Sequence, residues 1–268
     1  MMKESTIEWT HHTANLWHGC TKVHEGCDNC YAAAISKRYG NDIWGNDKPR
    51  KQIKSVWAEL IKFQKEAHAI GETHRVFVGS MMDIFEKPMT LIDHNGNQLQ
   101  HTTGDLRDIL FNNISNGMYP NLMFLMLTKR PSNINKYIPE AWKQTPPENV
   151  MFGTSPVNQE TANNLIGHLV KVNGKRFLSV EPQLEDLTLL PWLETNSIHW
   201  VIQGGESGPR KRPFNTDWAR LMMAECAVTG TPYFFKQIDK VQPIPEDLMI
   251  REFYDSDTNI NHAIHIAA

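Results

Sequence analysis

The chain has few cysteines, no long apolar run and little net charge. Four cysteines in 268 residues are too few for a disulfide framework, and no apolar run reaches the roughly 18 residues that a bilayer span needs. The first residues are polar, which argues against a signal peptide. A net charge of −3 gives no overall electrostatic reason to bind nucleic acid, although a local basic patch remains compatible with it. We therefore expect a cytoplasmic protein with no membrane partner.

The composition is that of an ordinary globular protein. Hydrophobic residues make up 40% of the chain and charged residues 21%, which is enough apolar material for a sizeable core. A length of 268 residues matches a single α/β barrel, which typically needs about 250. We expect one barrel domain over residues 1–240, followed by a loosely packed tail over 241–268, where two prolines precede Asp, Asn and His residues.

The cysteines are unevenly distributed. Cys20, Cys27 and Cys30 fall within eleven residues, with the spacing C-x6-C-x2-C, whereas Cys226 lies on an apparently amphipathic segment and is expected in the core. Clustered thiols in a reducing compartment indicate a metal site. Zinc or an iron–sulfur cluster normally takes four protein ligands, so this site either recruits a histidine or keeps one position open. The nearby candidates for a fourth ligand are His11, His12, His18 and His24.

Apolar strand-like runs alternate with helical patterns along the chain. This alternation predicts βαβ units and a parallel sheet, of six or seven units, as in a partial (βα)6 TIM-like barrel. A polar segment over 89–103 has the character of a hairpin inserted between a strand and its helix. The expected strands are 14–17, 75–79, 122–127, 150–152, 176–180, 199–202 and 232–235, and the expected helices are 31–39, 55–68, 105–113, 132–137, 159–172 and 217–227.

Polar residues follow six successive expected strands. In parallel sheets the loops after the strands converge on one mouth, where functional groups gather. The cysteine segment follows the first strand and belongs to the same rim. Helix caps and tight turns are the alternative explanation for any one of these residues. The residues concerned are Ser80, Asp83, Thr128, Lys129, Arg130, Thr154, Ser155, Glu181, Gln203, Gly204, Gly205, Glu206, Lys236 and Gln237.

Two further features near these strand ends favour an anionic ligand. The paired glycines Gly204 and Gly205 let a backbone approach a ligand closely, and their amides suit a carboxylate or phosphate. Lys129 and Arg130, and the basic run 210–212, could contact the same groups. A solvated surface is the alternative for the basic run.

Taken together, the motifs resemble a phage-associated three-cysteine family, found in phages and bacteria, whose members look like radical S-adenosylmethionine (SAM) proteins and have no settled substrate. The resemblance covers most of the chain in the family's order. It is carried by residues 7–10, 17–23, 26–32, 75–77, 80–85, 127–131, 153–154, 178–182, 200–209 and 234–237.

The resemblance implies a radical SAM barrel and its two cofactors. Cys20, Cys27 and Cys30 would ligate three irons of a [4Fe–4S] cluster, and SAM would bind the fourth iron and be cleaved to a 5′-deoxyadenosyl radical. An electron donor such as a flavodoxin or ferredoxin is implied as a partner. The ring of Tyr31 would lie against the adenine. The other expected SAM contacts are Ser80, Asp83, Thr128, Lys129, Arg130, Thr154, Glu181, Gly204, Gly205 and Glu206.

Two departures from the radical SAM pattern stand out. The common superfamily spacing is C-x3-C-x2-C, but six residues separate Cys20 from Cys27, and Asn29 occupies a position that is usually aromatic. In addition, a Gly-Gly-Glu that grips the SAM amine usually follows the second strand, whereas residues 204–206 come late. Ser80 and Asp83 occupy the corresponding strand end instead.

The sequence thus predicts a radical SAM enzyme acting on an unknown substrate. A nucleic acid or nucleotide is the first expectation for that substrate, and a peptide or small metabolite the second. The alternative is a zinc-binding, non-enzymatic protein, structural or nucleic-acid-binding, that uses the same three cysteines with His18 or His24.

Overall fold

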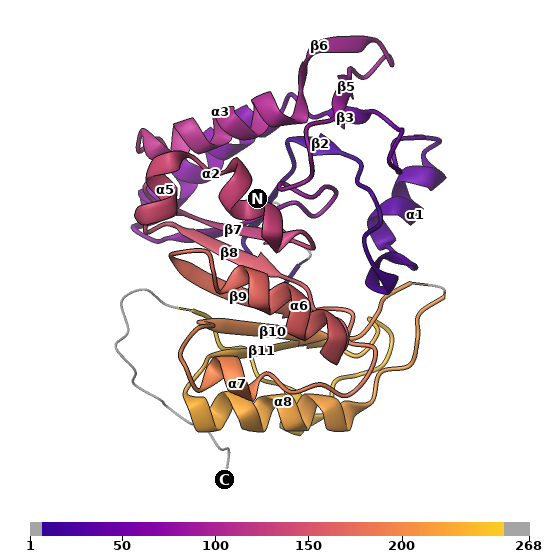
Figure 1. Ribbon diagram of the computed structural model, residues 1–268, viewed down its shortest axis with the longest axis vertical. Coiled ribbons are helices and arrows are strands. Elements are labelled where there is room, and N and C mark those ends of the chain that lie inside the picture. The colour runs from indigo at the N-terminus through magenta and orange to yellow at the C-terminus, as the bar shows by residue number, and fades with distance from the viewer. Residues whose placement is uncertain (1–6, 209, 255–268) are drawn as a thin grey trace.

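The computed structural model describes residues 7–208 and 210–254 (Figure 1). Its main sheet has seven strands, all parallel, and is curled into a half-barrel. The predicted parallel α/β architecture is therefore confirmed, with one strand more than six. In spatial order the strands are β1 (His12–Ala14), β4 (His74–Val78), β7 (Leu122–Thr128), β8 (Val150–Thr154), β9 (Lys175–Val180), β10 (Trp200–Gly204) and β11 (Tyr233–Gln237).

Helices cover the convex face of this sheet (Figure 1). The long ones alternate with the strands, as the sequence predicted, although the helix expected over 132–137 begins only at Ile134, after a 3-10 turn. The helices are α1 (Tyr31–Arg38), α2 (Val56–Ile70), α3 (Thr103–Ser115), α4 (Ile134–Tyr137), α5 (Glu140–Gln144), α6 (Gln159–Leu169), α7 (Leu190–Leu193) and α8 (Thr216–Thr229); 3-10 turns occupy η1 (Glu25–Cys27), η2 (Pro131–Asn133) and η3 (Glu246–Leu248).

A second, four-stranded sheet lies beside the half-barrel. It is built from β2 (Trp17–His18), β3 (Arg50–Gln52), β5 (Thr90–Ile92) and β6 (Gln98–Thr102), in that order. Strands β5 and β6 pair antiparallel, which confirms the hairpin expected within 89–103. The single first strand expected over 14–17 is wrong, because residues 12–14 pair with β4 whereas Trp17 and His18 pair with β3 in the second sheet.

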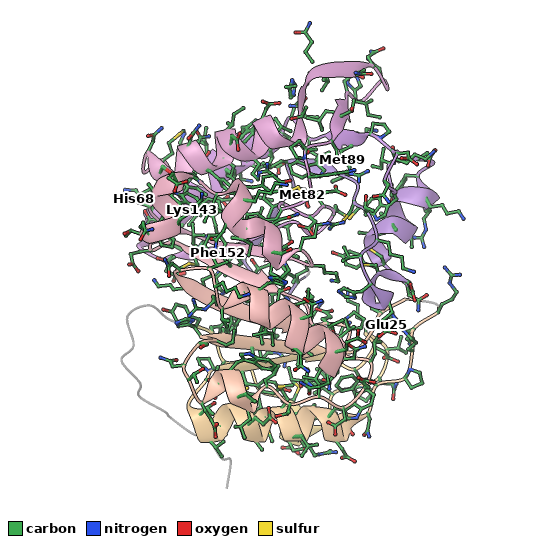
Figure 2. All side chains as sticks on the ribbon, viewed as in Figure 1. Glu25, His68, Met82, Met89, Lys143 and Phe152 are labelled. Atoms are coloured by element: carbon green, nitrogen blue, oxygen red, sulfur yellow. The ribbon has the colours of Figure 1, made fainter. Side chains whose placement is uncertain are left out.

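Two hydrophobic clusters occupy the two faces of the main sheet. The larger lies between the sheet and the helices, and Figure 2 labels one of its members, Phe152. The smaller fills the concave face and includes Trp9, Phe177, Trp200 and Phe234. Side chains on alternate positions of each strand supply the two clusters. The concave cluster packs the body of the half-barrel, which leaves the carboxyl ends of the strands free to form a cavity.

The described part of the segment after residue 240 packs against β11. The amide of Phe235 donates to the carbonyl of Ile250 at 3.1 Å, that of Glu252 donates to Tyr233 at 3.0 Å, and Leu248 is fully buried. The expectation of a loosely packed tail is therefore wrong for residues 241–254, and residues 255–268 lie outside the described part of the chain. None of the described helices is both long and apolar enough to cross a membrane.

Candidate cysteine site at the mouth of the half-barrel

A cavity of about 1120 Å³ extends from the amino ends of β1 and β4, where His11, His12 and His74 line it, to the carboxyl ends of the strands, where all three clustered cysteines line it. Most of the residues predicted from the strand ends therefore line one cavity. Two predicted contacts, Thr154 and Gly204, are not in the lining, and Ser179 is there although the sequence did not single it out. The predicted residues in the lining are Tyr31, Ser80, Asp83, Thr128, Lys129, Arg130, Ser155, Glu181, Gly205, Glu206 and Lys236.

The three cysteines are free thiols and are half-buried. Cys20 follows Gly19, whose φ of +114° belongs to the left-handed region, and a Cβ at Gly19 would lie 2.4 Å from the carbonyl oxygen of Ile43. Burial raises the pKa of Cys20 to about 12, and the charge of Asp83 adds to this effect, whereas Arg130 opposes it. A metal ion would have to displace the proton that Cys20 holds in this setting.

The three thiols are suitable metal ligands by their chemistry, but their positions in the structure do not form a metal site. Three thiols line one cavity, yet within residues 7–208 and 210–254 no group of three or more His, Cys, Asp or Glu side chains is arranged to hold a metal ion. The thiols would therefore have to move closer together when a metal binds. How far they can move depends on the contacts that hold the segment between Cys20 and Cys30.

Asp83 and Arg130 anchor the start of that segment. Arg130 donates to the Asp83 carboxylate at 2.7 Å and to the carbonyl of Thr21 at 2.6 Å, and its guanidinium lies 3.8 Å from the Cys20 sulfur. Asp83 also accepts hydrogen bonds from the Thr128 hydroxyl and from the amides of Phe85 and Lys129. All of its acceptor positions are engaged within the protein, so Asp83 organises the rim.

A buried ion pair beneath Arg130 holds the same segment. Arg50 is fully buried and Glu86 is nearly so, and the guanidinium binds both carboxylate oxygens, at 2.7 and 2.9 Å. The remaining donors of Arg50 reach the hydroxyl of Thr21 and three backbone carbonyls. This bidentate geometry requires the planar fork of an arginine.

Glu206 ties the far end of the segment to the loop after β10. Its carboxylate accepts from the side chain of Asn29 at 2.9 Å and from the guanidinium of Arg212 at 2.7 Å, and Arg212 also donates to the carbonyl of Glu25. Although burial acts to raise the pKa of Glu206, these hydrogen bonds hold it below its usual value. Figure 2 labels Glu25 at this junction. Asn29, between two of the cysteines, thus links the cysteine segment to the loop after β10 by hydrogen bonds.

The end of β4 meets the start of α1 through Ser80. Asn15 donates to the Ser80 hydroxyl at 2.8 Å and accepts from the amide of Met81, while the Tyr31 hydroxyl donates to the Ser80 carbonyl at 2.7 Å. Ser80 and Tyr31 therefore both face the cavity and are positioned by each other.

Deeper in the mouth, the polar residues fall into two groups. Glu181 and Lys236 form an ion pair between the ends of β9 and β11. Thr154 is fully buried and donates to the carbonyl of Thr128, away from the cavity. Ser155, the next residue, lines the cavity, and its hydroxyl is buried without a hydrogen-bond partner among the described residues.

The zinc alternative needs a histidine, and His24 is poorly suited in this conformation. Its Nδ1 accepts a hydrogen bond from the amide of Gly26, so the neutral ring carries its hydrogen on Nε2 and offers no lone pair there. Burial, together with the charges of Lys129 and Arg130, lowers the pKa of His24 to about 4, so the ring is neutral. His18 does not line the cavity.

Several supporting residues escaped sequence reasoning. Arg50 and Glu86 were not singled out, and Asn15 lay inside an expected strand. Arg212 belongs to the basic run expected to contact an anionic ligand or solvent, but it pairs with Glu206 instead. These side chains carry hydrogen-bond donors and acceptors, but the sequence spacing does not show that they lie near the cysteines in space.

The fold and the site together define a parallel α/β half-barrel protein with a three-thiol cavity at the carboxyl-end mouth. Comparison with protein families finds a match: the model of a family described as "Protein of unknown function (DUF5131)" matches residues 4–252. The chain belongs to that family. No curated protein matches it.

Proposed function

We propose that this protein is a radical SAM enzyme. The observation that carries the proposal is the placement of Cys20, Cys27 and Cys30 on one cavity, at the carboxyl ends of a curled parallel sheet and directly after its first strand. Among residues 7–208 and 210–254 no His, Asp or Glu is arranged with the three thiols as a fourth ligand, which favours a group that keeps one coordination position open.

In this proposal the three cysteines hold a [4Fe–4S] cluster. When bound, such a cluster supplies an electron to SAM coordinated at its open iron, and SAM is cleaved reductively. The chain's own contribution is to exclude water and to fix the positions of the bound groups. Trp9 and Phe77, which belong to the concave aromatic cluster, line the cavity and make part of its wall apolar.

The contacts divide the predicted SAM-binding residues into two roles. Asp83, Arg130 and Glu206 have their charged groups engaged with protein partners, which supports a role in holding the cysteine segment. Tyr31, Ser80 and Lys129 line the cavity and remain the residues suited to touch a bound ligand, whereas Glu181 lines it but is paired with Lys236. A nucleic acid or nucleotide is the proposed substrate class, and a flavodoxin or ferredoxin the proposed electron donor.

The test is anaerobic reconstitution of the full chain with iron and sulfide. We expect brown protein with about four irons per chain, which forms 5′-deoxyadenosine from SAM after reduction. Cys20→Ser, Cys27→Ser and Cys30→Ser should each lose both properties. Cys226→Ala is the matched control, because Cys226 is a buried core residue far from the cavity lining, and it should keep both. Colourless protein that binds one zinc and leaves SAM intact would overturn the proposal.

A further inference from the structure

Three polar residues on neighbouring strands lie side by side on the concave face. Thr128 pairs with Thr154 and Gly153 pairs with Phe177, so the registers place Lys129 beside Ser155 and Ser155 beside Ser179. Adjacent strands are about 4.8 Å apart, which brings the three side chains within reach of one small group. All three line the cavity.

The two serines are buried, and one of them lacks a partner. Ser155 is 1% exposed and Ser179 is 2% exposed, and the Ser155 hydroxyl makes no hydrogen bond among the described residues. A buried polar group without a partner destabilises a folded protein, because it has lost its hydrogen bonds to water. A ligand atom in the cavity would supply the missing partner.

The charge balance at the mouth leaves Lys129 in excess. Each carboxylate in this part of the lining already has a cationic partner: Asp83 binds Arg130, Glu181 binds Lys236 and Glu206 binds Arg212. Among the described residues, the Lys129 ammonium forms neither an ion pair nor a hydrogen bond, and its backbone amide alone is engaged, with Asp83. The wall therefore carries an unneutralised positive charge next to two buried hydroxyls.

We propose that Lys129, Ser155 and Ser179 form a subsite for the anionic group of a bound ligand, a carboxylate or a phosphate. The ammonium supplies the charge, and the two hydroxyls donate hydrogen bonds to the anion's oxygens. The inference deepens the proposed function, because it names the chemistry that a ligand of this cavity must present, but it requires no metal.

The test is calorimetric titration of the full chain, as purified, with three probes: pyrophosphate, S-adenosylhomocysteine and adenosine. Pyrophosphate carries only phosphate, S-adenosylhomocysteine carries a carboxylate, and adenosine has neither. We expect at least one anionic probe to bind at least about tenfold more tightly than adenosine, and whichever does so identifies the anion. Lys129→Gln should weaken that binding by about tenfold or more. Lys171→Gln, at an exposed lysine, is the matched control and should bind as the wild type does.

Ser155→Ala separates a binding role from a structural one. Removing an unpaired buried hydroxyl should leave the melting temperature unchanged or raise it, while weakening the anionic probe severalfold. The proposal is overturned if neither anionic probe binds, if Lys129→Gln binds like the wild type, or if Ser155→Ala lowers the melting temperature without affecting binding. If the protein forms no cluster but binds an anionic probe in a way that needs Lys129, the proposed function is wrong and the subsite stands. If the protein cleaves SAM but its binding of the anionic probes does not need Lys129, the subsite is wrong and the proposed function stands.

Discussion

Replacing Arg50 with methionine tests whether the buried ion pair supports the cysteine site. Arg50 and Glu86 are 0% and 2% exposed, and the substitution removes one partner of the pair while leaving the other charge buried. Such a loss costs about 3–5 kcal/mol of unfolding free energy, against a typical total of about 5–15 kcal/mol for a domain. Arg50→Met should therefore lose about a fifth or more of the protein's unfolding free energy, as measured by urea denaturation.

The structure sets the control and the refuting result. Arg220 binds Asp217 and Asp247 at the surface, where ion pairs contribute less than about 1 kcal/mol, so Arg220→Met should stay within that range. If Arg50→Met does not fold, Arg50→Lys keeps the charge but loses the fork, and it should still be destabilised by more than the Arg220 control. An Arg50 variant that is as stable as the wild type would refute the reasoning.

Three further predictions concern pH, the cysteine segment and a glycine. Burial, followed by the charge of a neighbouring histidine, lowers the pKa of His12 to about 4, so the unfolded chain binds the proton more readily; stability should fall as the pH drops from about 6.5 toward 4, and His12→Asn should flatten that dependence in urea titrations. Glu206→Gln should release the cysteine segment and speed alkylation of its thiols by about tenfold, whereas Glu225→Gln should leave the rate unchanged. A Cβ at Gly205 would lie 2.1 Å from a carbonyl oxygen, so Gly205→Ala should lower the melting temperature, while Gly167→Ala, with open space on a helix, should raise it slightly.

The sequence predicted the sheet because its buried strands are continuous apolar runs, and it predicted the mouth because parallel strands end on one edge. The same continuity hid which side chains face inward. Every residue of β8, Val150–Thr154, is buried, so the pattern could not tell that Thr154 faces the helices and Ser155 the cavity. Arg50 and Glu86 were missed because a charged residue gives no sign in sequence that a partner 36 positions away allows it to be buried.

The six residues between Cys20 and Cys27 are explained by where their ends are tied. Thr21 is held by Arg50 and by Arg130, which follows β7. Glu25 accepts hydrogen bonds from Asn158, which precedes α6, and from Arg212, which follows β10. The segment therefore crosses the mouth from one part of the rim to another.

We expect that a shorter connection would not make this crossing and keep both sets of contacts. Each residue extends a chain by at most about 3.5 Å, so removing three of the six residues would take away about 10 Å of reach. The wide spacing then follows from anchoring at two places, and it does not require the thiols to be farther apart when they bind a metal. On this reasoning, shortening the segment to three residues would break the Thr21 or the Glu25 anchor before it brought Cys20 any closer to Cys27.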